Sequence, residues 1–388
     1  MSKLAILNTH PIQYYSPYYR RLAQQPELKL RVFYGWGRAT EETYDLGFEE
    51  DVSWDIPLLD GYEHTFLENT ASDPGTHHFW GIVTPDLVPT IEEWRPDALL
   101  VFGWNFRAHL RALRHFHGRI PVLFRGDSTL IDESAGPRRW VRRGFLRWVY
   151  RHVDHALYVG QNNRAYFEAH GFADDWLTWI PHAIDNARFA DAPEADEKAR
   201  RWRHEIGIPD GAPVVLFAGK LVEEKAPDVL LDAFVSLETD ESHLVIVGSG
   251  PMEEALRAKM ESHTRVHFLG FQNQSRMPVV YRLGDLVALP SRSETWGLAV
   301  NEAMACGRPV VVSERVGCTP DLVDETNGRV VPPDDADALA CALDELLANQ
   351  DHLQSMGRRS AKRIEDWSID VAAARTADAV QATVKRDE

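Results

Sequence analysis

Short apolar segments rich in β-branched residues alternate with longer segments of helical pattern along nearly the whole chain. The first series comprises Leu4–Leu7, Leu30–Tyr34, Ala98–Phe102, Pro121–Phe124 and Ala156–Val159. The second comprises Val214–Ala218, Leu244–Val247, Val266–Leu269, Leu286–Leu289, Val310–Val312 and Arg329–Val331. Strands that alternate with helices predict right-handed βαβ units and parallel sheets. Two such series predict an α/β protein with two doubly wound, Rossmann-like domains in tandem.

The length of 388 residues agrees with two domains, because single hydrophobic cores stop growing at roughly 250–300 residues. An Ala-, Asp- and Glu-rich stretch at 191–197 predicts a linker or an exposed helix start, and the domain boundary is expected near residues 185–196. Residues 336–388 are expected to form consecutive helices with a break near 366–368. We therefore predict an N-terminal domain over 1–190, a second domain over 191–365 and a C-terminal helix over 366–388.

Charge and cysteine content limit the class of partner and the cellular compartment. The formal net charge of −17 argues against non-specific binding of nucleic acid, which needs a basic surface. The three cysteines show no CxxC spacing and are too few for a disulfide framework, so a reducing, cytoplasmic setting is expected. No signal peptide is expected, since the N-terminal apolar run covers only Leu4 to Leu7, and no apolar stretch approaches the roughly 20 residues that span a bilayer.

A lysine-containing turn follows the first strand of the second series. The strand is expected to end at Gly219, and a helix is expected to begin near Pro227, with Lys220 and Lys225 between them. The carboxyl ends of parallel strands form the ligand crevice of such sheets, and helix N-termini favour anions. The two lysines could therefore hold a diphosphate as point charges. The alternative is an ordinary solvated loop, which the neighbouring Glu223 and Glu224 would suit.

A second polar loop follows the strand Leu286–Leu289. Glu294 lies in this loop, and Glu302 lies in the helix expected to follow it. Gly297 would let backbone amides approach a ligand closely. A carboxylate at this position could accept paired hydrogen bonds from sugar or ribose hydroxyls. The alternative is that Glu302 faces solvent on the helix and that Glu294 is a capping residue in the loop.

Taken together, these segments resemble those of the family-4 glycosyltransferases, retaining enzymes of the GT-B fold. Glu294 and Glu302 match the family's Glu, seven residues, Glu signature, and Gly219-Lys220 and Lys225 match its phosphate-binding turn. The sequence IPHAID at 180–185 is close to the family's IPNGVD, and NGRVVPP at 327–333 also matches. The resemblance is strong over 180–370 and looser over 1–180.

The resemblance implies a role for each matching residue. Lys220 and Lys225 would bind the donor diphosphate and stabilise the leaving group, Glu294 would hydrogen-bond the transferred sugar, and Glu302 would hold the ribose hydroxyls. Contacts with the base, sugar and phosphate are implied for Gly248, Gly250, Phe271, Thr295, Trp296, Gly297 and Leu298. The family normally requires no metal or other cofactor, and we see no DxD motif or zinc-like cluster; His77, His78, His115 and His117 are expected to be isolated surface residues. The last helices are implied to cross back to the N-terminal domain.

The N-terminal domain is expected to face the acceptor. The loop after the first strand, NTHPIQYYSP at 8–17, lacks the glycines that family members often have, so side chains such as His10 would serve there. A histidine that only structures the turn is an equal alternative. The histidines that many family members carry after the Pro96-Asp97 strand are missing, and His109 lies further on in a helix. Arg125 and Asp127 are further candidates for acceptor contact, with a mutual salt bridge as the alternative.

The segment RRWVRRGFLRWVYRH at 138–152 predicts a basic, aromatic helix. Val141, Phe145, Trp148, Val149 and His152 fall on one face and are expected to pack into the core. The other face carries Arg139, Arg143, Arg147 and Arg151. This arginine stripe predicts either a solvated face or a site for anionic lipid head groups or a phosphorylated acceptor.

The expected function is transfer of a sugar, with retention and without a metal, from a UDP- or GDP-sugar to a glycan or lipid-linked glycan acceptor. The expected location is the cytoplasm, with peripheral contact at the inner face of the cell membrane as an option. A phosphorylase or epimerase of the GT-B type is an alternative, but those enzymes lack the Glu294/Glu302 segment. A non-catalytic protein that binds nucleotide sugar is a further alternative, against which the intact lysine and glutamate pairs argue.

Overall fold

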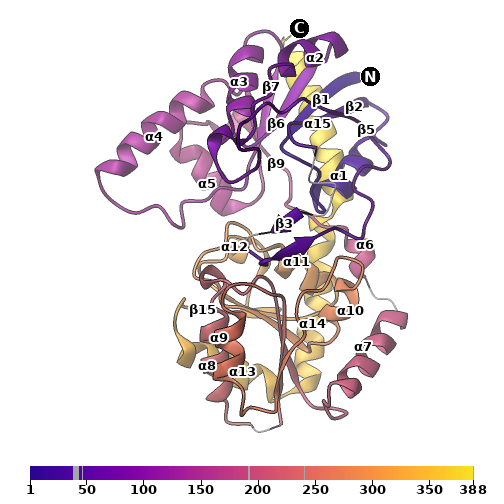
Figure 1. The fold of residues 1–388 in the computed structure, drawn as a ribbon, viewed down its shortest axis with the longest axis vertical. Coiled ribbons are helices and arrows are strands. Elements are labelled where there is room, and N and C mark those ends of the chain that lie inside the picture. Colours follow the sequence, from indigo (N-terminus) through magenta and orange to yellow (C-terminus); the bar gives the residue numbers. More distant parts are fainter. Residues whose placement is uncertain (38–42, 46, 191–192, 240, 388) are drawn as a thin grey trace. The chain divides into compact units, whose positions relative to one another are not determined.

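The computed structural model describes residues 1–37, 43–45, 47–190, 193–239 and 241–387 (Figure 1). Their contacts divide the chain into two compact units. Unit 1 comprises Met1–Thr43, Ile56–Ala183 and Ile369–Glu388, and unit 2 comprises Tyr44–Asp55 and Ile184–Ser368. The short segment Tyr44–Asp55 thus belongs with unit 2 although it lies far from it in sequence, which the sequence did not predict. The predicted domain limits at 190 and 365 stay predictions.

Unit 1 is built on a seven-stranded, all-parallel sheet of order β5-β2-β1-β6-β7-β8-β9. Its strands are β1 (Ser2–Asn8), β2 (Leu28–Tyr34), β5 (Glu63–Phe66), β6 (Ala98–Phe102), β7 (Val122–Arg125), β8 (His155–Tyr158) and β9 (Leu177–Trp179). Its helices are α1 (Tyr15–Leu22), α2 (Leu87–Trp94), α3 (Arg107–Phe116), α4 (Pro137–Tyr150), α5 (Gln161–Ala169) and α15 (Ile369–Asp387), with 3₁₀ turns η2 (Phe79–Gly81) and η3 (Asp174–Trp176).

The β1 strand shows why this sheet is covered on both faces. Ala5 and Leu7 belong to one apolar cluster, and Leu4 and Ile6 belong to another, because successive side chains of a strand point to opposite faces. The second cluster includes residues of α15, which lies beside α1 (Figure 1). The Tyr18 hydroxyl lies 2.8 Å from Thr376 Oγ1 in that interface. The end of the chain is thus part of the unit that contains its beginning.

Unit 2 is built on a six-stranded, all-parallel sheet of order β12-β11-β10-β13-β14-β15. Its strands are β10 (Val214–Ala218), β11 (His243–Val247), β12 (Val266–Phe268), β13 (Leu286–Leu289), β14 (Val310–Ser313) and β15 (Gly328–Val331). Its helices are α6 (Asn186–Phe189), α7 (Pro193–Glu205), α8 (Pro227–Val235), α9 (Glu253–Lys259), α10 (Met277–Tyr281), α11 (Leu298–Ala305), α12 (Thr319–Leu322), α13 (Ala336–Leu347) and α14 (Gln350–Ile364), with 3₁₀ turns η4 (Glu223–Lys225) and η5 (Glu365–Trp367). A two-stranded sheet joins β3 (Thr43–Asp45) to β4 (Glu50–Val52).

Both sheets reverse their strand order once, and this position is where such folds bind ligands. In unit 2 the reversal lies between β10 and β13, and in unit 1 it lies between β1 and β6. The predicted α/β class with two Rossmann-like, doubly wound sheets is confirmed. The predicted helix break near 366–368 is also confirmed, since η5 and Ser368 separate α14 from α15. Of the two alternatives for the stretch 191–197, the exposed helix start is confirmed, because α7 begins at Pro193; residues 191 and 192 lie outside the described residues.

Candidate functional site

Three glycines allow the chain to approach itself closely at the carboxyl ends of β10 and β11. A Cβ added to Gly248 would lie 1.9 Å from the carbonyl oxygen of Gly219, and Gly248 has a φ of 133°. A Cβ added to Gly250, whose φ is 148°, would lie 2.9 Å from the carbonyl oxygens of Leu221 and Gly47. Only glycine adopts this backbone without strain. Gly248 and Gly250 are buried, and with Gly219 they form a glycine turn that brings the loops after β10 and β11 into close backbone contact.

Lys220 and Lys225 lie in the loop that leaves β10 beside this turn. The η4 turn ends at Lys225, and Ala226 takes a left-handed conformation with φ of 51° before α8 begins at Pro227. Burial, and then the charge of Lys220, lower the pKa of Lys225 to about 8, and the charge of Glu224 opposes this shift. A bound anion would stabilise the charged form of this buried lysine, and a strongly shifted pKa at a strand end is typical of a functional site.

The loop after β13 is fastened to the loop after β14 through its backbone. The Glu294 amide donates to the carbonyl of Arg315 at 3.1 Å, and the Gly317 amide donates to the carbonyl of Glu294 at 2.9 Å. Gly297 has a φ of 98° and precedes the first residue of α11, Leu298. Thr295 is exposed. The Glu294 side chain is thus carried by a rigid backbone at the end of β13.

Lys225 and Glu294 meet across the reversal between β10 and β13. Nζ of Lys225 contacts Oε2 of Glu294, and their side chains are 24% and 15% exposed. Arg292 joins the two loops, because it donates to the Asp228 carboxylate at 2.7 and 3.0 Å and to the carbonyl of Glu223 at 2.7 Å. Its amide also donates to the carbonyl of Glu224 at 2.8 Å. The sequence reasoning missed this role of Arg292.

Glu302 and Trp296 are buried behind this pair. Glu302 is 2% exposed and accepts a hydrogen bond of 2.7 Å from the Tyr281 hydroxyl. The Trp296 indole is 3% exposed, donates to Asn301 at 2.9 Å and stacks on Trp367. Its side chain is therefore part of the core, and only its backbone is suited to touch a ligand. The predicted roles of both residues stay predictions.

The segment Tyr44–Asp55 supplies residues beside the glycine turn that the sequence reasoning did not find. The Phe48 ring lies 4.9 Å from that of Phe271, and Nζ of Lys220 lies 4.6 Å from the centre of the Phe48 ring. The Ser249 hydroxyl donates to the Glu50 carboxylate. These contacts place the Phe48 ring beside Phe271 and Lys220, and the Glu50 carboxylate beside Ser249, which lies between Gly248 and Gly250. No motif in the sequence marks this segment, because its contacts lie some 200 residues further along the chain.

In unit 1 the predicted residues His10 and Asp127 lie at the carboxyl ends of β1 and β7. Burial lowers the pKa of His10 to about 4, and its Nδ1 lies 3.0 Å from the Thr9 hydroxyl oxygen. Asp127 raises the pKa of Tyr15, after the larger effect of burial, so these two groups are close. The Tyr15 ring stacks on that of His182, which the sequence reasoning also missed as a site neighbour.

Arg125 does not suit the predicted contact with an acceptor. Its side chain is buried, and its guanidinium donates to the carbonyls of Ile180 and Pro181 at 3.2 and 3.0 Å. Arg125 therefore supports the backbone that follows β9. His109 is likewise fully buried, with Nδ1 3.2 Å from the carbonyl of Gly103.

The predicted core face of α4 is wrong at two positions. Val141 and Phe145 are 75% and 43% exposed, whereas Val149 is buried as expected. Two arginines of the predicted stripe contact neighbouring side chains of unit 1. Arg143 pairs with Glu133 at 2.5 Å, while Arg139 lies over the neighbouring ring of Trp140.

The expectation that His77 and His78 are isolated is also wrong. Nε2 of His77 and Nε2 of His78 lie 3.0 and 3.3 Å from the Asp73 carboxylate. The ligand atoms of these three residues all lie within 4.8 Å of one another. Asp73 and His77 are exposed, and hydrogen bonds within the turn account for the arrangement.

The sequence matches the family model described as "Glycosyl transferases group 1" over residues 198–363. The chain is 32% identical over 222 residues to the D-inositol 3-phosphate glycosyltransferase of Nocardia farcinica, covering 54% of this chain and 48% of that protein. It is 30% identical over 251 residues to the GDP-mannose-dependent alpha-(1-6)-phosphatidylinositol monomannoside mannosyltransferase of Mycolicibacterium smegmatis, covering 61% of this chain and 65% of that protein. The chain thus spans about half the length of the first of these curated relatives and somewhat more of the second.

Solved structures show the same fold at low identity. Anabaena HepE in complex with UDP and glucose superposes with a TM-score of 0.71 and 16% identity, covering 98% of this chain and all of that one. Sucrose-phosphate synthase from Thermosynechococcus elongatus gives a TM-score of 0.76 and 18% identity over the full length of both chains. Residues 198–363 therefore match the glycosyl transferases group 1 model, within a chain that has the GT-B fold.

Proposed function

We propose that this protein is a retaining, metal-independent glycosyltransferase that uses a UDP- or GDP-sugar. The observation that carries the proposal is the contact between Lys225 and Glu294 at the strand-order reversal of unit 2. At this position the lysine can bind the diphosphate of a nucleotide sugar, and the glutamate can bind its sugar. The match of residues 198–363 to a glycosyltransferase family model supports this assignment.

Each group has a chemical role in the proposed reaction. Lys220 and Lys225 neutralise the charge that develops on the diphosphate as the bond from the anomeric carbon to its phosphate oxygen breaks. Glu294 accepts hydrogen bonds from the sugar hydroxyls, and Glu302 accepts them from the ribose. The new bond forms between the anomeric carbon and the acceptor oxygen on the same face of the sugar. The acceptor proton passes to the departing diphosphate, so no protein nucleophile is needed.

The acceptor is proposed to be a glycan or a lipid-linked glycan, bound in unit 1 near His10 and Asp127. The curated relatives named above include a phosphatidylinositol mannoside enzyme, which supports a lipid-linked acceptor. His10 and Asp127 are at the carboxyl ends of strands in a doubly wound sheet, where such folds hold ligands. Buried His10 has a lowered pKa and is therefore suited to accept a hydrogen bond in its neutral form.

A panel of UDP, GDP, ADP and their sugars, scored by thermal shift, tests donor use. A ligand that binds only the folded state raises its melting temperature. The same panel is then incubated with and without EDTA, and release of nucleoside diphosphate is measured. We expect one nucleoside diphosphate of the panel to raise the melting temperature. We expect the corresponding nucleotide sugar to be hydrolysed at the same rate with and without EDTA. Epimerised or phosphorolysed product without transfer, or binding without any turnover, would contradict the proposal.

We further propose that α4 brings the protein to the inner face of the cell membrane, in the cytoplasm. No helix among the described residues is both long and apolar enough to cross a bilayer. Trp140, Val141 and Phe145 are nevertheless 66%, 75% and 43% exposed on a helix that also carries the arginines at 138, 139 and 142. Exposed aromatic and aliphatic side chains beside arginines are typical of helices at an anionic lipid surface.

Co-sedimentation with vesicles tests the role of α4. The variant Trp140→Ala should bind vesicles containing phosphatidylglycerol more weakly than the wild type. Trp80→Ala is the matched control, since Trp80 is 59% exposed elsewhere in unit 1. Equal binding of the wild type, Trp140→Ala and Trp80→Ala would exclude α4 as the contact.

A further inference from the structure

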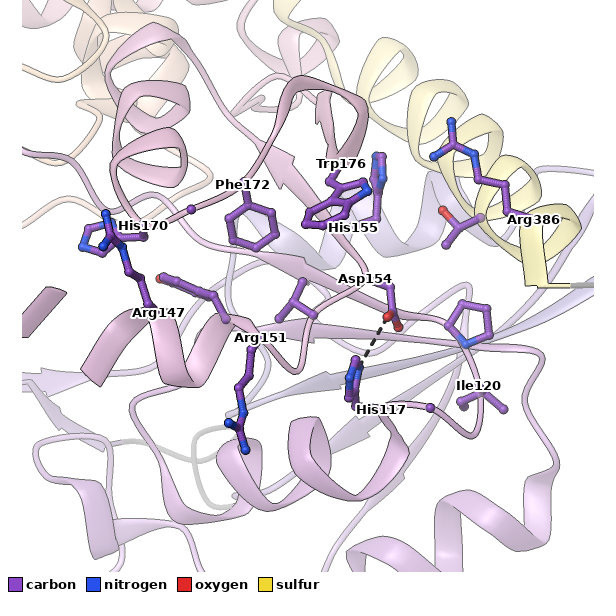
Figure 2. Close-up of a pocket in the computed structure, with 16 residues that line it drawn as sticks. His117, Ile120, Arg147, Arg151, Asp154, His155, His170, Phe172, Trp176 and Arg386 are labelled. Atoms are coloured by element: carbon purple, nitrogen blue, oxygen red, sulfur yellow. Dashed lines mark ion pairs between the residues drawn. The ribbon is translucent and has the colours of Figure 1, made fainter. Parts of the chain in front are cut away.

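Figure 2 shows a cavity of about 670 Å³ in unit 1, at the amino ends of β7, β8 and β9. The side chains of Arg147, Arg151 and Arg386 line this cavity from separate sides and point away from one another. Oδ1 of Asp154, which lies between two of them, is 3.3 Å from Nδ1 of His117. The charges of this cavity therefore do not meet at one point. By contrast, charged and polar groups beside the glycine turn of unit 2 do meet, and what they contact is another segment of this chain.

Residues 47–50 contact groups that are proposed to bind the donor. Nζ of Lys220 lies 4.6 Å from the centre of the Phe48 ring. A Cβ added to Gly47 would lie 2.6 Å from the same Nζ, so the backbone at Gly47 passes closely against the lysine. The carbonyl oxygen of Gly47 would also lie 2.9 Å from a Cβ added to Gly250. The lysine and the glycine turn are thus both in contact with this part of the chain.

Glu50 places a carboxylate beside the position proposed for the donor diphosphate. The Ser249 hydroxyl, between Gly248 and Gly250, donates a hydrogen bond to Oε1 of Glu50. Carboxylate and phosphate oxygens are both anionic acceptors, so both suit the same hydroxyl group. Two such anions side by side repel each other. Glu50 and the donor diphosphate are therefore competitors for this side of the site.

A second set of contacts holds the other end of the segment on the loop after β12. The Asn273 side-chain amide donates to the carbonyl of Ser53 at 2.6 Å, and its oxygen accepts from the Asp55 amide at 3.3 Å. The Ser275 amide donates to the Asp55 carboxylate at 3.0 Å. None of these four residues is among the groups proposed to bind the donor. Residues 47–50 can therefore leave Lys220 while residues 53–55 stay attached.

We propose that residues 47–55, here called the strap, compete with the donor for its own site: a donor that binds displaces residues 47–50 from Lys220 and Ser249. This inference rests on the proposed function, because it takes Lys220 as a ligand of the donor diphosphate. The two occupants exclude each other, so the apparent donor affinity is the intrinsic affinity reduced by the fraction of protein whose strap is released. The strap therefore sets how much donor is needed before the site fills.

Titration of nucleotide into strap variants tests the competition. UDP and GDP are titrated into the wild type, Phe48→Leu and Phe48→Ala, because Phe48 contacts Lys220 without being one of the groups proposed to bind the donor. We expect Phe48→Leu to lower the dissociation constant of the bound nucleotide about threefold, since it loses a partly exposed cation–π contact. Phe48→Ala also loses the ring contact with Phe271, so its effect should be at least as large.

A matched control shows that the effect belongs to the strap. Phe66→Ala removes a phenylalanine that is 39% exposed in unit 1, outside the strap, and should leave the dissociation constant unchanged. Melting temperatures confirm that each variant is folded. A decrease in Phe66→Ala as large as in the Phe48 variants would overturn the inference.

Hydrogen exchange of the wild type shows whether the strap moves. With saturating UDP or GDP, whichever binds, we expect the amides of residues 48–50 to exchange faster, because the contacts with Lys220 and Ser249 are lost. The amides of residues 53–55 should keep their rate, because Asn273 and Ser275 continue to hold them. Slower exchange at residues 48–50 would show instead that the strap closes over the nucleotide, and would overturn the inference.

Failure of this inference and failure of the proposed function give different results. Nucleotide binding that is unchanged or weaker in both Phe48 variants would overturn the inference and leave the proposed function standing. If the proposed function is wrong, neither UDP nor GDP binds the wild type or any variant, and the inference falls with it.

Discussion

Lys225 and Glu294, which are 69 positions apart in sequence, form an ion pair at the carboxyl ends of β10 and β13. The pairing of Val215 with Leu286 and of Leu216 with Val287 brings these strand ends together. Arg292 then holds the lysine loop against the glutamate loop through Asp228 and the carbonyl of Glu223. In the proposed function, this pair binds a substrate that is negative at one end and rich in hydroxyls at the other.

Loss of either member of this pair should abolish transfer without unfolding the protein. We expect Lys225→Ala and Glu294→Gln each to lower the transfer rate at least about 100-fold, as for other groups that stabilise a charged transition state. Lys259→Ala is the matched control, since Lys259 pairs with Asp232 on the surface of the same unit. Rates of donor turnover and melting temperatures are measured for all three. A near-wild-type rate in either site variant would refute the assignment.

Donor affinity should fall above pH 8. The pKa of Lys225 is lowered to about 8, so the free protein loses this positive charge as the pH rises through that value. Above pH 8, Lys225 must take up a proton when the donor binds. Donor affinity should therefore decrease by up to about tenfold per pH unit. Titrations with the nucleotide sugar from pH 6.5 to 9 measure the effect. Lys225→Arg should remove this decrease of donor affinity with pH, because arginine stays charged. If donor affinity still falls above pH 8 in this variant, another group causes the decrease.

Glu50 should oppose donor binding. Its carboxylate accepts a hydrogen bond from Ser249 beside the glycine turn, where the donor diphosphate is proposed to bind. Glu50→Gln should therefore tighten donor binding by roughly threefold, within the range of about 0.2–1 kcal/mol for exposed charge pairs. Glu49→Gln is the matched control, because it removes the same charge at the adjacent, exposed position. Equal dissociation constants for the Glu50 and Glu49 variants would show that this carboxylate does not act on the donor.

Two glycine substitutions should change stability in opposite directions. In Gly248→Ala the new Cβ would lie 1.9 Å from the Gly219 carbonyl oxygen, so we expect a loss of at least about 2 kcal/mol in the free energy of unfolding. In Gly144→Ala the new Cβ meets nothing within 4 Å in the middle of α4, and the free energy of unfolding should rise by about 0.5–1 kcal/mol. Urea denaturation measures both. A Gly248→Ala variant as stable as the wild type would contradict the close approach.

The parallel strands were predictable wherever both faces of a strand are buried. In β1 successive residues enter opposite layers, so the stretch from Leu4 to Leu7 is continuously apolar, as is all of β10, and both stand out from their surroundings. The strand β5 was missed because its four residues, EHTF, are largely exposed at the sheet edge. The strand β9 was missed because it has only three half-buried residues.

The helical periodicity of α4 was correct, but its interpretation was not. Periodicity shows which side chains share a face and does not show how far a packing partner extends along it. Leu146, Val149 and Tyr150 reach the core, whereas Val141 is 75% exposed and Phe145, which contacts Trp104 on one side, is still 43% exposed. Figure 1 shows α4 at the margin of unit 1.

The sequence alone determined the two doubly wound sheets and the four charged residues of the candidate site, because apolar runs and strand-end motifs are local. Only the tertiary structure decided that Lys225 touches Glu294 and that Phe48 and Glu50 lie beside Lys220 and Ser249. These pairs are separated by 69 to 199 positions along the chain. Contacts over such distances depend on strand order and loop paths, which no short stretch of sequence encodes.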